Sequence, residues 1–327
     1  MRTLGALAVL LALAAAAGAA DFEKNAVGTT GAQLLQLDVG ARGIAMGGAY
    51  SSVTNDVYSL YWNPAGLARV PRMSASFVYT NYVADISFQS GAIAARVNDT
   101  AVISGGFRYA DYGTVNHTDL SGNDLGTFTP KDYVMEAGWG QSVYDLSDSE
   151  VDVNVGVAGR WLHSDYLMHA DGYSGDIGML ARFYHGNYAY DFSFVAQNMG
   201  VGQSFDKRRD TMPFQVRLGG SMQPVKNLIV SVESVSPSGN VTYGALGAEY
   251  AAEVSRNVRA AIRAGFNSQT LEDLGVQTAM SVGGGLTVGT FTFDYAFVPF
   301  GLLGDVHRFS LSWNLPSKAS RRYRERD

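Results

Sequence analysis

Cysteine is missing from the sequence altogether, and charged residues are scarce. With no cysteine among 327 residues, disulfides, thiolate catalysis and cysteine-based metal sites are excluded. Asp, Glu, Lys and Arg make up only 17% of the chain, below the roughly one quarter that is usual for soluble proteins. The net charge of −6 also argues against a nucleic-acid partner.

Long apolar runs are absent beyond the N-terminus. No later stretch approaches the roughly 18 uninterrupted apolar residues that a membrane-spanning helix needs, and the mean hydropathy is −0.01. Residues 1–20 begin with Arg2, continue as an apolar stretch from Leu4 to Ala16, and end in small residues. This order is typical of a signal peptide that is removed on export. The alternative, a membrane anchor, is disfavoured because the apolar run is short and no basic flank follows it.

A two-residue rhythm of apolar and polar side chains is present from Arg72 onward. Val151, Val153 and Val155 alternate with polar or small residues, and Phe291, Phe293, Tyr295 and Phe297 do the same. Successive side chains of a strand point to opposite faces, and about ten residues suffice for a tilted strand to cross a bilayer. The rhythm predicts fourteen strands, at 73–80, 86–96, 101–109, 132–141, 151–162, 175–183, 188–197, 212–222, 227–235, 240–250, 257–266, 280–288, 290–298 and 305–313.

The lengths of the connections support a membrane barrel. The even-numbered connections are mostly short, such as Val97–Thr100 and Tyr184–Asn187, whereas Ala110–Lys131, His163–Ser174 and Asn198–Thr211 are long. Outer-membrane barrels have short periplasmic turns and longer outer loops. We therefore predict an all-β fold, a transmembrane antiparallel up-and-down barrel over residues 72–313 of a bacterial outer-membrane protein.

Charges of both signs fall on the strand face opposite the apolar one. A charge facing lipid near the bilayer centre costs roughly 2–4 kcal/mol, so this face is assigned to the lumen. Ion pairs that stabilise a filled lumen are the favoured interpretation, and the lining of a conduction path is the alternative. The predicted lumen-facing residues are Asp152, Arg160, Arg182, Asp191, Arg217, Glu233, Arg259, Arg263, Asp294 and Arg308.

Two segments lie outside the predicted barrel. Residues 21–71 are rich in Gly, Ala and small polar residues, with helical hints at 32–37 and 57–62. We interpret them as a hatch, a compact segment that folds into or under the barrel, and a flexible periplasmic lead is the alternative. Residues 314–327 carry Lys318 and four arginines, which predicts a basic periplasmic tail, either simply solvated or in contact with phosphate headgroups or a partner.

The N-terminal segment resembles a known family. Gly28 to Gln33, Gly40 to Ala49 and the run Leu60-Tyr61-Trp62-Asn63-Pro64-Ala65-Gly66-Leu67-Ala68 resemble the N-terminal signature of the PorV/PorQ family, a branch of the FadL-like outer-membrane barrels. The resemblance implies a fourteen-stranded barrel with an N-terminal hatch, and Asn63, Pro64 and Ala65 carry over as hatch residues. The chain departs from many barrels because it continues beyond Trp313, although Phe309, Leu311 and Trp313 can still act as an internal assembly signal.

The resemblance also implies partners. PorV-like members serve type IX secretion, in which they receive and shuttle exported cargo at the outer membrane. The partners implied are secreted cargo proteins and other secretion components, beside outer-membrane lipid and lipopolysaccharide. FadL-like members move long-chain fatty acids or other hydrophobic small molecules, which is the first alternative. A structural envelope protein is the second.

No arrangement of residues in the sequence predicts catalysis. The five histidines lie in loops or at strand edges without the spacing of a zinc pair, and nucleophile-elbow and phosphate-loop motifs are absent. An acidic loop with Asp119, Ser121, Asn123 and Asp124 could hold Ca²⁺, but a solvated outer loop is favoured. We expect no enzymatic activity, cofactor or bound metal.

Overall fold

Fourteen strands form a closed antiparallel barrel in the computed structural model, as the sequence predicts. The structure describes residues 27–82, 86–145, 151–186, 188–271 and 275–316. Each strand of the barrel pairs with its neighbours in chain order, and β1 (Met73–Asn81) pairs with β16 (Asp305–Leu315) to close the ring. Closure leaves no free sheet edge, which is what a barrel in lipid requires. None of the helices in the described ranges is long and apolar enough to span a membrane.

The observed strands agree closely with the predicted ones. Besides β1 and β16, the barrel contains β2 (Ser87–Arg96), β3 (Ala101–Asp111), β6 (Lys131–Asp145), β7 (Val151–Asp165), β8 (His169–His185), β9 (Tyr188–Val201), β10 (Gln215–Val225), β11 (Leu228–Pro237), β12 (Tyr243–Ser255), β13 (Val258–Asn267), β14 (Met280–Val288) and β15 (Phe291–Pro299). The last strand continues two residues past the predicted start of the tail at 314, because Asn314 and Leu315 pair with Ser74 and Met73. Residues 1–26 and 317–327, and so the predicted signal peptide and most of the predicted tail, lie outside the described residues.

The outward face of the barrel is apolar all the way round. Every strand contributes at least one large apolar side chain that is exposed on the isolated chain, as lipid-facing residues must be. In chain order these include Phe77, Ile93, Ile103, Met135, Val157, Ile177, Phe192, Leu218, Val232, Leu246, Ile262, Val282, Phe293 and Leu311. The predicted assembly residues Phe309, Leu311 and Trp313 share this face of β16, and Phe309 packs against Phe293 and Tyr295 of β15.

One side of the barrel is much taller than the other. Strands β6 to β9 have 14 to 17 residues, whereas β1, β14 and β15 have nine each. The predicted long loop at 163–174 is therefore wrong: β7 and β8 continue their pairing to Asp165 and His169, and only residues 166–168 form the turn. The rhythm weakens in the sequence there because polar residues, His163, Asp165, His169 and Asp171, occupy the outward face, which is apolar lower in the same strands.

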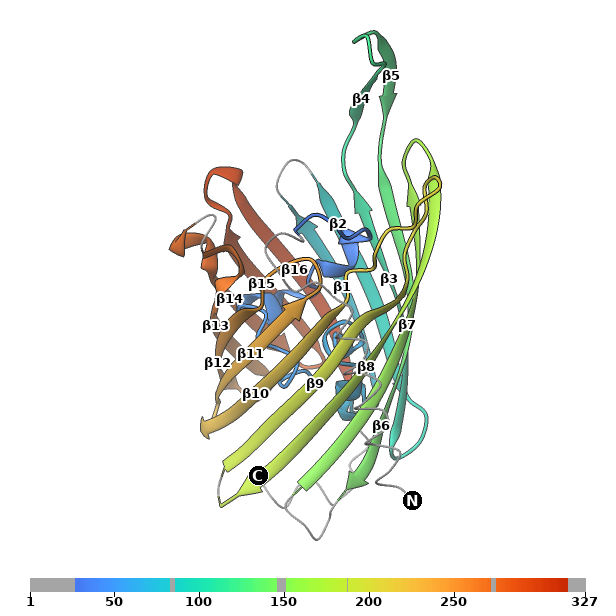
Figure 1. The fold of residues 1–327 in the computed structure, drawn as a ribbon. Coiled ribbons are helices and arrows are strands. Elements are labelled where there is room, and N and C mark those ends of the chain that lie inside the picture. Colours follow the sequence, from blue (N-terminus) through green and yellow to red (C-terminus); the bar gives the residue numbers. More distant parts are fainter. Residues whose placement is uncertain (1–26, 83–85, 146–150, 187, 272–274, 317–327) are drawn as a thin grey trace.

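The predicted loop at 110–131 contains a second, separate sheet. β4 (Val115–Thr118) and β5 (Asp124–Phe128) form a two-stranded hairpin, which stands above the barrel at the top of Figure 1. The carboxylate of Asp119 accepts hydrogen bonds from Ser121 N, Asn123 N and Asn123 Nδ2 at the tip. These donors, above all the Asn123 side chain, hold the pKa of Asp119 below its usual value. The acidic loop therefore forms its own turn, and no metal-binding group of side chains occurs in the described part of the chain.

The hatch fills the inside of the barrel. Its short helical turns are η2 (Gln33–Gln36), α2 (Ala41–Ala45), α3 (Ser59–Trp62) and η3 (Pro64–Arg69), drawn in blue within the ring of strands in Figure 1. The largest fully buried side chains of the described residues include Trp62, Tyr50, Tyr58 and Leu60 of this segment. Most of the apolar core therefore belongs to the hatch, and the barrel encloses it.

Candidate functional site: a filled lumen below an open aromatic pocket

Glycines on the inward face of the strands let the hatch backbone lie directly against the barrel. A Cβ added to Gly156 of β7 would lie 2.2 Å from the carbonyl carbon of Pro64, and one on Gly265 of β13 would lie 1.9 Å from Gly47 N. Real Cβ atoms do not approach backbone so closely, so no other residue fits without displacing the hatch. Gly159 of β7 points outward and has no such neighbour within 4 Å. The richness in glycine thus serves close packing in the lumen.

The predicted hatch residues Asn63, Pro64 and Ala65 lie at the centre of this contact. Asn63 is fully buried, and its side-chain amide donates to Ser51 O at 3.0 Å and to Met179 O of β8 at 3.2 Å. Its side-chain oxygen accepts from Ala65 N at 3.0 Å and so caps η3, where Pro64 occupies the first turn. The Asn-Pro-Ala step therefore joins the hatch to the barrel and begins a helical turn.

A buried ion-pair chain connects α2 to three strands. Arg42 of the hatch makes a bidentate pair with Glu249 of β12, with N···O distances of 2.7 and 2.8 Å. Arg263 of β13 donates to the same carboxylate at 2.6 Å and to Asp294 of β15 at 2.7 Å. In this group of ion pairs, both carboxylates, Glu249 and Asp294, lie beside at least one guanidinium, as buried charges require.

Two further groups fix other parts of the hatch. Arg69 donates to Asp191 of β9 at 2.6 Å, and Arg182 of β8 forms a bidentate pair with the same carboxylate. Glu233 of β11 accepts from Arg217 of β10 at 2.5 Å and from both the backbone N and the hydroxyl of Ser51 at 2.9 Å. Movement of the hatch would therefore break several buried, charge-assisted hydrogen bonds at once.

A fourth group belongs to the strands alone. Glu136 of β6 lies between Arg108 of β3, at 2.5 Å, and Arg160 of β7, at 2.8 Å. Arg160 also forms a close bidentate pair with Asp176 of β8. The Asp176 carboxylate in turn accepts from the backbone N of Asn198, where β9 departs from regular pairing. This group joins five adjacent strands, β3 and β6 to β9, across the lumen side of the tall part of the barrel.

The structure places the ten predicted lumen residues in different settings. Seven are buried on the inward face: Arg160, Asp191, Arg217, Glu233, Arg263, Asp294 and Arg308. Arg182 and Asp152 lie opposite one another near the short-turn end of the barrel and are only half-buried. Arg259 shares the inward register but is exposed near the turn before β13. Arg308 donates to the backbone carbonyl of Asp38, and its buried Nε has no hydrogen-bond partner among the described residues.

Sequence reasoning missed half of the charge network. Arg108, Glu136, Asp176 and Glu249 lie on strands where glycine and alanine blur the alternation, and Arg42 and Arg69 belong to the hatch. Every second residue of a strand faces inward, so counting in steps of two from one clearly inward residue would have found the four strand residues. Two cavities that the described residues of the hatch and barrel enclose between them measure about 140 Å³ and 20 Å³.

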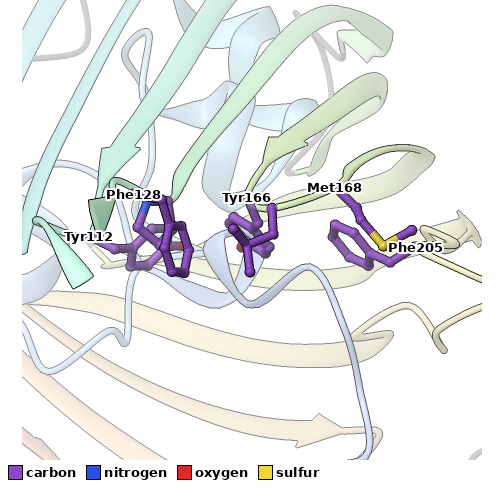
Figure 2. A pocket seen from close by; sticks show the side chains of 7 residues that line it. Tyr112, Phe128, Tyr166, Met168 and Phe205 are labelled. Carbon is purple, nitrogen blue, oxygen red and sulfur yellow. The ribbon is translucent and has the colours of Figure 1, made fainter. Parts of the chain in front are cut away.

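Above the hatch, the outer mouth holds an open pocket of about 550 Å³. Three outer connections line it with apolar side chains, which Figure 2 shows: Tyr112, Phe128 and Pro130 between β3 and β6, Tyr166, Leu167 and Met168 of the β7–β8 turn, and Phe205 after β9. The rings of Tyr166 and Phe205 stack at 5.4 Å, and Tyr112 meets Tyr166 edge-on at 6.4 Å. The pocket has no counterpart in the sequence pattern, because its residues meet only when three loops converge.

The pocket has a polar floor whose hydrogen bonds are already satisfied. Asp132 is buried on the inward face of β6 and accepts from Tyr112 Oη at 2.7 Å, from Tyr166 Oη at 3.0 Å and from the hydroxyl of Ser164. Burial raises the pKa of Tyr166 to about 12, and it also raises the pKa of Tyr112. Both phenols therefore stay protonated and donate to Asp132, so the pocket presents their rings rather than free polar groups.

Comparison of the sequence with known protein families identifies a family of secretion proteins. The family model described as type IX secretion system protein PorV matches residues 20–223. These residues contain the hatch and the first half of the barrel, including the predicted signature. No curated protein matches the sequence.

Solved structures that share this fold include two toluene transporters and a FadL homologue. The Pseudomonas putida toluene transporter TodX has a TM-score of 0.54 at 12% identity, covering 84% of this chain and 96% of its own. The Ralstonia pickettii toluene transporter TbuX has a TM-score of 0.53 at 12% identity, covering 85% and 98%. A Pseudomonas aeruginosa FadL homologue has a TM-score of 0.52 at 10% identity, covering 84% and 98%. At these identities the similarity concerns the fold alone.

Proposed function

The chain belongs to the PorV family of type IX secretion system proteins, and from this premise we propose that it receives exported proteins at its outer rim while its lumen stays closed. The observation that carries the proposal is the division of the molecule into a filled lumen and an open outer mouth. A polypeptide cannot pass cavities of about 140 Å³ and 20 Å³. A role in export must then use the outer surface.

The hatch contacts support a lumen that remains closed during the functional cycle. Three separate ion-pair or charge-assisted groups, at Arg42, Ser51 and Arg69, join the hatch to three strands of the barrel, β12, β11 and β9. Removing one partner of a buried pair costs about 3–5 kcal/mol. Opening the lumen would need several such contacts to break together, which docking at the outer rim does not require.

A reversible covalent link between hatch and barrel tests this proposal. The hydroxyls of Ser51 and of Ser193 on β9 lie 2.7 Å apart, and the natural chain has no cysteine that could interfere. A Ser51→Cys, Ser193→Cys double variant would form a disulfide that fixes the hatch. We expect a strain that carries only this variant to export type IX cargo to the cell surface equally well with the disulfide oxidised or reduced.

The reduced form of the same variant is the matched control, because it carries both substitutions without the link. Export that fails only in the oxidised form would overturn the proposal. Export that continues when the gene is deleted would show that this chain has no part in secretion. Planar-bilayer recordings of the wild-type protein supply a second readout, in which we expect no stable channel steps.

A second candidate function is the uptake of small hydrophobic molecules, which the apolar outer pocket favours. Such uptake would need the hatch to move so that a molecule in the pocket could cross the lumen. The same double variant separates the two functions: oxidation should abolish uptake of a labelled monoaromatic hydrocarbon if the barrel transports it. We expect no difference in uptake between vesicles with the oxidised and the reduced form.

A further inference from the structure

Resting on the proposed function, we propose that the outer pocket is the docking site for an extended polypeptide segment that carries large apolar side chains next to negative charge. The pocket is defined by Tyr112, Phe128, Pro130, Tyr166, Leu167, Met168 and Phe205. Its volume of about 550 Å³ exceeds that of one buried aromatic side chain and is far smaller than a folded domain. Two or three neighbouring side chains of a bound segment would fill it.

The position of the pocket favours a ligand from the aqueous exterior over lipid. Asp132 and Ser164, which hold the two tyrosines, occupy inward positions of β6 and β7. The pocket therefore lies on the axis side of the tall strands and above the hatch, away from the apolar face that contacts lipid. Leu167 and Met168 are 57% and 51% exposed, so a bound ligand could bury this apolar surface.

The aromatic walls are preorganised to bind side chains. Three rings are held at fixed angles, with Tyr166 stacked on Phe205 at 8° and edge-on to Tyr112 at 80°. Both tyrosine hydroxyls are engaged by Asp132, so a ligand meets ring faces and a flexible methionine. Rigid aromatic rings beside an adaptable methionine form the kind of surface that binds peptide side chains.

Charges at the two ends of the pocket give the ligand a direction. Lys207, Arg208 and Arg209 follow Phe205 directly and are exposed, and their side chains have no ion pair among the described residues. The flanking Asp206 and Asp210 reduce the net charge of this loop to +1, but Asp210 lies against Gly31 of the hatch. At the other end, the hairpin beyond Phe128 carries Asp119 and Asp124. The acidic end of a bound segment should therefore lie toward residues 207–209.

The test uses purified full-length protein in detergent micelles and a display library of random dodecapeptides. We expect the enriched peptides to combine aromatic or large aliphatic residues with net negative charge. A fluorescent copy of the consensus peptide should bind Met168→Arg at least tenfold more weakly than wild type. A Lys207→Glu, Arg208→Glu double variant should weaken binding by a similar factor and should accept a charge-reversed peptide instead.

Matched controls separate the pocket from general surface effects. Leu302→Arg places the same charge on a fully exposed apolar residue between β15 and β16, away from the pocket, and Arg256→Glu reverses an exposed charge at the turn before β13. Both should bind the peptide as the wild type does. Enrichment of basic peptides, binding that ignores Met168→Arg, or no enrichment at all would overturn the proposal.

Sodium dodecanoate below its micellar concentration distinguishes an anionic amphiphile from a peptide. If dodecanoate binds more tightly than the consensus peptide and loses affinity in Met168→Arg, the pocket is a lipid site and the proposal is wrong. Because these measurements need no cells, their failure leaves the export result for the hatch-linked variant unchanged. The docking site and the proposed function can therefore fail separately.

Discussion

The lumen and the outer mouth of this barrel use opposite chemistry within one ring of strands. In the lumen, glycines let backbone meet backbone and arginines pair with carboxylates, as at Arg42 and Glu249. At the mouth, three loops bring aromatic rings together and leave apolar surface exposed around Tyr166. The lumen is packed around its hatch, whereas the mouth leaves an open apolar pocket. This difference is what the proposed function at the outer rim rests on.

The largest effect on folding should come from a side chain placed between the hatch and the barrel. In Gly156→Val the new Cβ would lie 2.2 Å from the Pro64 backbone, which neither strand nor hatch can relieve by a rotamer change. Overpacking usually costs about 1–3 kcal/mol, and contacts with backbone cost more. We expect loss of the heat-modifiable folded band on gels. Gly159→Ala, on the outward face of the same strand, should fold as wild type, and equal folding of both variants would contradict the close packing.

Removal of the shared carboxylate should have the next largest effect. Glu249→Ala leaves Arg42 and Arg263 buried beside each other without their common partner. We expect a loss of about 3–5 kcal/mol in the free energy of unfolding, measured by urea titration in micelles. A double variant that also carries Arg42→Ala should recover part of the loss, and a purely additive result would show that the two groups do not interact.

A change below the pocket should act locally. Asp132→Ala removes the acceptor of Tyr112, Tyr166 and Ser164, and buried donors without a partner cost about 1–3 kcal/mol. We expect faster hydrogen exchange at residues 166–168 and weaker peptide binding. The backbone amides of the hatch should exchange hydrogen at the same rates as in the wild type. Equally fast exchange throughout the lumen would show that mouth and hatch form one cooperative unit.

The smallest effect should come from the predicted lumen charge that the structure leaves exposed. Arg259→Ala removes a side chain near the turn before β13, away from the buried groups. Surface substitutions of this kind usually change stability by no more than about 0.5 kcal/mol. A loss comparable to that of Glu249→Ala in the same urea titration would place Arg259 in the buried network.

Particular residues show how far sequence reasoning extends. The alternation around Val151 and Phe291 fixes strand, register and inward face at once, since side chains on a strand have a period of two. The same logic puts Arg160, Arg263 and Asp294 on the inward side. Their partners Glu136 and Glu249 were missed because glycines at neighbouring inward positions carry no polarity signal. The strand ends around the turn at 166–168 were not predicted, because outward positions such as His163 and Asp171 are polar and hide the apolar alternation.

The sequence by itself determined the barrel, its fourteen strands and the existence of a hatch, because lipid imposes a local pattern that every strand must repeat. Tertiary structure alone decided how Gly156 meets Pro64, which carboxylate each arginine contacts, and that Tyr112, Tyr166 and Phe205 form one pocket. Those contacts join residues far apart in the chain. They depend on how the strands tilt and the loops converge, which no local pattern records.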